Sequence, residues 1–215
     1  MIKTLLLALT ATFLTATFIS LANAFAHPVS YQGAVSLMSY NKPDENELLL
    51  TYSFKSYVAA GLYYFREGET NYSMPRVNLL AKRWNNEDSQ ANIYLGAGYG
   101  VERSFDESKA VTYGSVDVDW ESRKYYTAAA YSRFFRDSSG PQARPDFEMI
   151  KARVGFAPYL AEYNDINAWL ILQADKKNDS GTELTQFVRL FYKNVLIELG
   201  AGFNGNWAFN YMVHF

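Results

Sequence analysis

The chain has 215 residues, of which 49% are hydrophobic and 17% aromatic, with no cysteine and a formal net charge of −2. The absence of cysteine excludes a disulfide framework and a thiolate-ligated metal or iron–sulfur site. A net charge this close to zero favours neither a nucleic-acid partner nor a polybasic patch that binds membrane lipid.

The first 26 residues are typical of a secretory signal peptide. Lys3 provides the positive start, an apolar run occupies residues 5–21, and Ala24 and Ala26 form a small-x-small cleavage site. We predict cleavage after Ala26, which makes His27 the first residue of the mature chain. The alternative, an uncleaved membrane anchor, is disfavoured because threonines interrupt the apolar run.

Beyond residue 26 the chain divides into segments of about ten residues separated by turn-forming clusters. No run approaches the roughly 18 apolar residues of a membrane-spanning helix. Within most segments apolar residues alternate with polar or small ones, which is the period of a strand with two unlike faces. The predicted strands are residues 29–40, 47–55, 57–66, 76–84, 91–102, 112–121, 124–135, 147–156, 166–175, 182–193, 195–204 and 207–215.

The even strand number suggests a closed sheet. We predict an all-β fold in which residues 27–215 form a single domain, a closed antiparallel barrel of about twelve strands. Ten or eight strands are the alternatives, because two weakly alternating segments can merge. If the mature chain is embedded in a membrane, it must be as a closed barrel, since lipid offers backbone groups no hydrogen-bond partners.

The C-terminal segment shows the clearest alternation. Every second residue is large and apolar: Trp207, Phe209, Tyr211, Val213 and Phe215. A terminal phenylalanine after alternating aromatics resembles the closing strand of bacterial outer-membrane β-barrels. The resemblance implies a monomeric barrel in the outer membrane of a Gram-negative bacterium. It also implies that periplasmic chaperones deliver the chain and that the barrel-assembly machinery reads this ending as its signal.

The predicted connections alternate between longer and shorter ones along most of the chain. Residues 67–75 and 103–111 are expected to be long polar loops, whereas the connections near residues 56 and 122 are short. Outer-membrane barrels place long loops outside the cell and short turns in the periplasm. Both ends of the chain are therefore expected on the periplasmic side.

Gly96, Gly98 and Gly100 alternate along one predicted strand. A phosphate-binding glycine loop requires a helix directly after it, and none is predicted here. We expect these glycines to relieve crowding or to allow a bend in the strand.

The inward positions of the predicted strands carry charges of both signs. The predicted lumen charges are Lys82, Asp117, Asp119, Glu121, Arg133, Lys151, Arg153, Arg189 and Glu198. Such charges persist only when they are paired, hydrogen-bonded or wet. Since twelve strands exceed the eight-stranded size that side chains fill, we predict a narrow channel for small polar or charged solutes. The alternative is a closed structural or surface-binding barrel without transport.

We expect no enzymatic activity. The resemblance implies that a catalytic histidine would lie at the outer rim, whereas His27 and His214 are both expected at the periplasmic end. A glycosidase needs a carboxylate pair with one protonated member. Asp117 and Asp119 are the candidates, but nearby arginines would keep both of them ionised.

No cofactor is expected, with one alternative that concerns the two histidines. In a closed barrel the first and last strands are neighbours, which would bring His27 close to His214. The α-amine of a mature His27 and the two imidazoles would suit Cu(II), which favours such ligands in tetragonal geometry. This arrangement resembles the histidine brace of copper proteins. The competing interpretation is that both histidines are ordinary polar residues at the periplasmic rim.

Overall fold

The computed structural model describes residues 27–105, 107–136, 144–162 and 164–215, which form twelve strands. The predicted signal peptide lies outside the described residues. No helix in the described part of the chain is long and apolar enough to cross a membrane. The strands are β1 (Val35–Lys42), β2 (Glu45–Lys55), β3 (Val58–Glu67), β4 (Thr70–Asn85), β5 (Ser89–Ser104), β6 (Glu107–Ser122), β7 (Tyr125–Arg136), β8 (Phe147–Phe156), β9 (Asn167–Lys177), β10 (Glu183–Tyr192), β11 (Val195–Gly202) and β12 (Trp207–His214).

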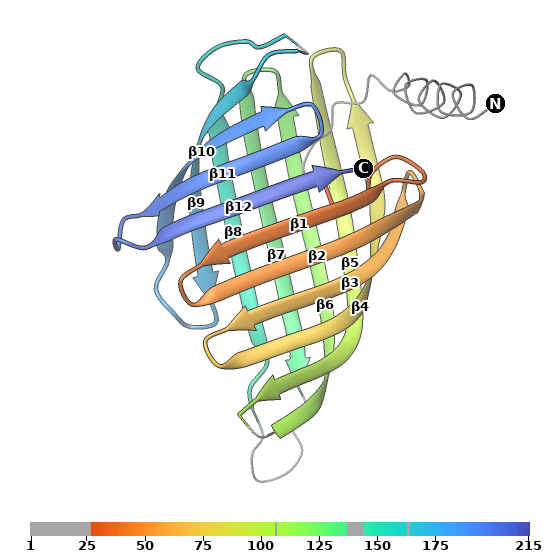
Figure 1. Cartoon of the computed structure of the whole chain (residues 1–215), viewed down its shortest axis with the longest axis vertical. Helices are drawn as coiled ribbons and strands as arrows, with labels where there is room; N and C mark the ends of the chain where they lie inside the picture. The colour runs from red at the N-terminus through yellow and green to blue at the C-terminus, as the bar shows by residue number, and fades with distance from the viewer. Residues whose placement is uncertain (1–26, 106, 137–143, 163) are drawn as a thin grey trace, which may run out of the picture.

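The sheet closes on itself because β1 pairs with β12 as well as with β2. The β1–β12 pairing is antiparallel and places Ser36 opposite His214. Two backbone hydrogen bonds extend it: the Phe215 N–H donates to the Val35 carbonyl at 2.8 Å, and the Val35 N–H donates to the Phe215 carbonyl at 3.2 Å. The predicted closed, antiparallel, twelve-stranded barrel is confirmed. In Figure 1 the strands of the near wall cross those of the far wall, as tilted barrel strands do.

We call the end of the barrel at which β1 begins and β12 ends the terminal end, and the other the opposite end. The outer surface between them is apolar: Leu62, Val154 and Leu199, on three separate strands, are 65%, 56% and 60% exposed. Exposed aromatic residues flank this band, with Phe54, Trp120 and Phe215 toward the terminal end and Tyr99, Phe135 and Trp207 toward the opposite end. An apolar band between two aromatic girdles is the surface of a barrel that spans a membrane.

Two predicted loops are strands instead. Strands β4, β5 and β6 each have 16 residues, and they include most of residues 67–75 and 103–111, with tight turns in place of the long loops. A membrane-spanning strand needs only about 9–11 residues, so these strands continue beyond the lipid. In the parts of these strands that lie beyond the lipid, outward side chains such as Ser73 face water. A polar sequence in these parts therefore does not distinguish a loop from a strand.

The first strand begins later than predicted, at Val35 rather than at residue 29. Residues 27–34 instead enter the barrel at the terminal end and contact its inner wall. The Ser30 N–H donates to the Ser53 hydroxyl at 3.0 Å, and the Gly33 N–H donates to the Ser53 carbonyl at 2.8 Å. Gly33 has a φ of +90°, a conformation that glycine adopts without steric cost. This residue turns the segment from the lumen into the barrel wall.

We call the paired edges of β1 and β12 the seam. Its hydrogen bonds allow a prediction of how changes at the C-terminus affect assembly. Deletion of Phe215 removes two backbone hydrogen bonds, each worth about 1 kcal/mol, together with a girdle aromatic. Phe215→Lys keeps the backbone bonds and costs about 0–1 kcal/mol near the interface. We expect the deletion to lower the yield of folded barrel more than Phe215→Lys. The measurement is the fraction of membrane-extracted protein that shifts on heating in a denaturing gel.

Phe203→Lys is the matched control, because Phe203 is an aromatic residue that is 71% exposed in the connection between β11 and β12 at the opposite end. Equal yields for the Phe215 deletion and the Phe203 variant would contradict a special role of the seam.

Candidate functional site

A cavity of about 180 Å³ lies inside the barrel. His27 and Asp119 line it near the terminal end, and Glu45 and Lys177 line it near the opposite end. These residues belong to different ends of the barrel, so the cavity follows much of the length of the lumen. A volume of this size accommodates on the order of ten water molecules.

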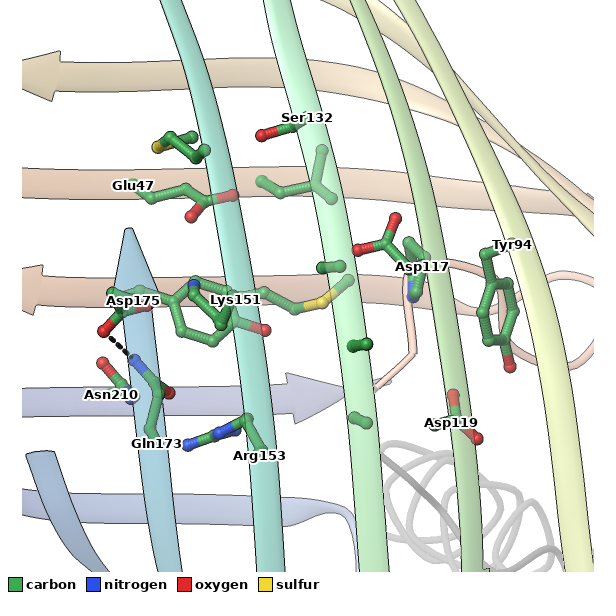
Figure 2. Close-up of a pocket in the computed structure, with 18 of the residues that line it drawn as sticks. Glu47, Tyr94, Asp117, Asp119, Ser132, Lys151, Arg153, Gln173, Asp175 and Asn210 are labelled. Atoms are coloured by element: carbon green, nitrogen blue, oxygen red, sulfur yellow. Dashed lines mark hydrogen bonds between the residues drawn. The ribbon is translucent and has the colours of Figure 1, made fainter. Parts of the chain in front are cut away.

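The inner face of β6, which borders the cavity, is acidic. Asp117, Asp119 and Glu121 occupy alternate inward positions, as predicted from the sequence. The Asn92 side-chain amide donates to Asp119 Oδ1 at 2.7 Å, and the Ser115 hydroxyl donates to Asp117 Oδ2 at 3.2 Å. Figure 2 shows Asp117 and Asp119 together on one side of the cavity.

A basic part of the wall begins two strands away, beyond β7, and contains Lys151 and Arg153 of β8 and Arg189 of β10. Glu198 of β11, which is 1% exposed, joins the two arginines. Arg153 Nη2 donates to Glu198 Oε2 at 2.8 Å, and Arg189 Nε donates to Glu198 Oε1 at 2.7 Å. The Asn210 amide also donates to Oε2, at 2.7 Å. Two guanidinium groups around one carboxylate leave this wall with net positive charge.

Three lumen charges, Arg76, Asp117 and Lys151, have no ion pair within 4.0 Å among the described residues. The Arg76 guanidinium lies 5.0 Å from the centre of the Tyr63 ring and 4.8 Å from that of Tyr113, which are cation–π distances. A buried charge without a direct counter-charge needs solvation. These residues therefore indicate that water occupies the cavity.

Gly96 makes room for Arg76. A Cβ atom at this position would lie 2.8 Å from Arg76 Nη2 and 2.5 Å from Ser115 Oγ. Those two atoms form a hydrogen bond of 3.2 Å, which any larger residue would disturb. This glycine relieves crowding within a strand, as the sequence predicts.

Lys82 does not face the lumen as predicted. The register between β4 and β5 shifts between Leu80 and Lys82, so the alternation reverses at this bulge. Lys82 is on the outer face, where its ammonium lies 5.6 Å from the centre of the Trp84 ring. Arg83 takes the inward position and donates to Asn92 Oδ1 at 2.7 Å.

Arg133 is also outside the lumen, because the inward positions of β7 belong to its buried neighbours Ser132 and Phe134. It forms an ion pair of 2.7 Å with Asp146, in the connection between β7 and β8. Asp146 also accepts the Arg136 backbone N–H at 3.0 Å. This hydrogen bond and the Arg133 guanidinium hold the pKa of the Asp146 carboxyl below its usual range. The pair therefore belongs to the rim of the barrel.

Further charges line the cavity and were not predicted, among them Glu47, Arg76 and Asp175. Alternation was the signal that could have identified Arg76 and Glu47, since each is followed by an outward apolar residue. Asp175 ends a segment whose inner face the sequence does not define.

Ion pairs cross the lumen near the opposite end. Lys177 of β9 contacts Glu45 of β2 at 2.5 Å and Glu67 of β3 at 3.2 Å, and Lys42 of β1 contacts Asp175 of β9 at 2.9 Å. Strand β9 is not adjacent to β1, β2 or β3 in the sheet. These pairs therefore narrow this end of the cavity.

Aromatic side chains fill another part of the lumen toward the opposite end. The aromatic cluster consists of Tyr63, Phe65, Tyr72, Tyr113, Phe134 and Phe147. Phe134 is at its centre, with ring centres 4.4 Å from Tyr72 and 4.9 Å from Tyr113. Sequence reasoning missed the cluster because large residues occupy both faces of these strands, as in the neighbours Phe134 and Phe135. Alternation alone does not assign a face to such a pair.

The two histidines contact different elements. His27 Nδ1 lies 3.4 Å from Asp119 Oδ2 of β6, and its ring stacks on Tyr94 at 5.0 Å. His214 Nδ1 is hydrogen-bonded to the Ser36 hydroxyl of β1 at 2.7 Å. His27 is thus a lumen residue rather than a rim residue. The predicted copper site shared by the two histidines has no support in these contacts and stays a prediction.

No protein-family model matches the chain, and no curated protein matches it. Among solved structures the chain is similar to the KdgM porin, with 12% identity, a TM-score of 0.48, and coverage of 85% of this chain and 98% of that one. The KdgM porin in complex with disordered oligogalacturonate gives the same values. OccK8 (OprE) of Pseudomonas aeruginosa has 9% identity and a TM-score of 0.40, with coverage of 80% of this chain and 57% of that one.

The closed strand order and the apolar outer band with its aromatic girdles decide the architecture, independently of these likenesses. The chain is a closed, membrane-spanning β-barrel. This barrel holds a charged cavity and an aromatic cluster in one lumen.

Glu198 is the only carboxylate of the Arg153–Glu198–Arg189 cluster. We therefore expect its removal to lower the stability of the barrel strongly. Glu198→Ala leaves two buried guanidinium groups without their partner, and loss of one member of a buried pair costs about 3–5 kcal/mol. We expect a matching fall in the free energy of unfolding, measured by urea titration of the barrel in micelles with tryptophan fluorescence.

Glu162→Ala is the control, since Glu162 pairs with Arg123 at 3.8 Å and both side chains are exposed. Exposed pairs contribute less than about 1 kcal/mol. A Glu198→Ala effect as small as that of the control would show that the cluster does not stabilise the barrel.

Proposed function

We propose that the barrel is a narrow channel for small polar or charged solutes in the bacterial outer membrane. The observation that carries this proposal is the cavity, which follows the lumen. It is lined by charges that have no direct ion pair among the described residues, namely Arg76, Asp117 and Lys151. A purely structural core would be expected to pair or omit such charges. Water-filled passages tolerate them.

Opposed charges give the passage a means of orienting its solute. Asp117 and Asp119 are on β6, whereas Lys151 and Arg153 are on β8, two strands away, and Arg189 is on β10. The field between oppositely charged parts of the wall aligns a dipolar or zwitterionic solute across the passage. A polar solute that carries both donors and acceptors fits this arrangement better than a simple ion of either sign.

The proposal includes an orientation and partners. Barrels of this class keep both chain ends in the periplasm, which makes the terminal end the periplasmic one. We expect a monomer surrounded by outer-membrane lipid. We also expect periplasmic chaperones and the barrel-assembly machinery as partners, with the alternating residues from Trp207 to Phe215 as the assembly signal. We expect no enzymatic activity and no nucleic-acid partner.

Lys151→Glu tests the channel directly. Lys151 lines the cavity and has no direct ion pair within the described part of the chain. Reversing its charge therefore changes the lumen field without breaking the Arg153–Glu198–Arg189 cluster. In planar bilayers we expect steady single-channel conductance for the wild type and a shift toward cation selectivity for Lys151→Glu, measured as the reversal potential in a salt gradient.

Lys124→Glu makes the same change of charge in the exposed turn after β6 and should leave the reversal potential close to that of the wild type. If Lys151→Glu behaves like Lys124→Glu, the cavity is not the conducting path. If the wild type and the variants are all silent, the channel proposal fails.

A closed structural or surface-binding barrel is the second candidate, and the aromatic cluster favours it. Phe134 is fully buried and has ring contacts with Tyr63, Phe65, Tyr72, Tyr113 and Phe147. In this candidate the cluster and the ion pairs of Lys177 would seal the opposite end of the lumen.

Phe134→Ala separates the two candidates. Removing the ring at the centre of the cluster opens space in the lumen, so we expect the single-channel conductance to rise at least about twofold if the cluster restricts a channel. Phe135→Ala is the matched control, because Phe135 is the next residue, faces outward and is 47% exposed. A silent wild type that becomes conducting only as Phe134→Ala would favour a barrel that is closed in its resting state.

A further inference from the structure

At the terminal end of the lumen, His27 meets two carboxylates of β6. His27 Nδ1 lies 3.4 Å from Asp119 Oδ2, and His27 Nε2 lies 3.9 Å from Glu121 Oε1. One donor atom from each residue can be chosen so that all three lie within 4.8 Å of one another. We propose that His27, Asp119 and Glu121 bind a divalent transition-metal ion of the zinc or copper type inside the barrel.

A second observation points to a ligand at this position. Glu121 is 5% exposed, and its Oε1 atom has no hydrogen bond within the described residues. Leaving a buried carboxylate oxygen without a hydrogen bond is costly. This oxygen is directed toward the His27 ring, where a cation would satisfy it.

The donor set and its spacing suit such an ion. Imidazole nitrogen and carboxylate oxygen are established ligands of Zn²⁺, at about 2.0–2.2 Å. Two ligands at that bond length in a tetrahedral site are about 3.4 Å apart, and the separation of His27 Nδ1 from Asp119 Oδ2 is 3.4 Å. Because donor atoms of all three residues lie within 4.8 Å of one another, a change in the Glu121 side-chain torsions would complete the third contact. Imidazole as a ligand favours zinc or copper over magnesium or calcium.

The proposed metal site lies where two cavities of the lumen meet. His27 and Asp119 line the main cavity, whereas Glu121 lines a second cavity at the terminal end. A bound ion would therefore lie between the two cavities. It would also tie residues 27–34 to β6 as well as to β2, and so hold this segment across the periplasmic mouth.

This site differs from the copper site predicted for His27 and His214. His214 Nδ1 is hydrogen-bonded to Ser36 in the β1–β12 seam, and it is not a member of the donor group formed by His27, Asp119 and Glu121. Substitution of His214 therefore distinguishes the two arrangements. The metal site does not depend on conduction, so a silent barrel leaves its test intact.

The test is calorimetric titration of the full chain, purified from membranes in detergent, with Zn²⁺ and separately with Cu²⁺. We expect one ion to bind per barrel. His27→Ala, Asp119→Asn and Glu121→Gln should each weaken binding at least about tenfold, whereas His214→Ala should keep the wild-type affinity. Asp119→Asn and Glu121→Gln conserve side-chain size, and the heat-dependent gel shift confirms that each variant is folded.

Absence of binding to the folded wild type would overturn the proposal. Wild-type affinity in both Asp119→Asn and Glu121→Gln would also overturn it. A loss in His214→Ala as large as that in His27→Ala would replace this site with the shared histidine pair.

Discussion

Closure of the sheet between β1 and β12 is the constraint on which the rest of the structure depends. A lipid-exposed strand edge would leave a row of N–H and C=O groups without partners, at several kcal/mol for each group. The seam from Ser36–His214 onward and the two backbone bonds between Val35 and Phe215 remove that edge. The closed wall then separates an apolar outer surface from an interior that lipid never reaches. Only because of this separation can charged residues occupy the inner positions.

Two kinds of packing share that interior. Toward the opposite end, the aromatic cluster around Phe134 fills space as a hydrophobic core does. Beside it, the cavity between the β6 carboxylates and the β8 and β10 cations keeps space that only water or a solute fills. The cluster supplies rigidity and the cavity supplies a polar path. The width of any passage therefore depends on how the aromatic side chains and the cross-lumen pairs of Lys177 are arranged.

The N-terminal segment adds a third component at the terminal end. Residues 27–34 turn into the lumen, where Val29 is buried beside Ala59 and Tyr94. The segment brings His27 to the acidic wall of β6, which would otherwise have no nearby imidazole. Residues 27–34 thus occupy part of the lumen at this end of the barrel. The metal site that we propose depends on this inward turn.

The sequence by itself determined the fold class and many of the lumen charges. Alternation with period two placed Asp117, Arg153 and Glu198 inside, and an even number of alternating segments with an aromatic ending indicated a closed barrel. Both properties can be read within single strands, because each strand has one face toward lipid and one face toward the lumen.

The tertiary structure alone decided what depends on register and on distant partners. The bulge after Leu80 moved Lys82 outside, since a shift of one residue reverses every later side chain. The inward face of Phe134 and the course of the segment that carries His27 were decided in the same way. Neither follows from neighbouring residues, because both depend on which surfaces the closed sheet brings together across the lumen.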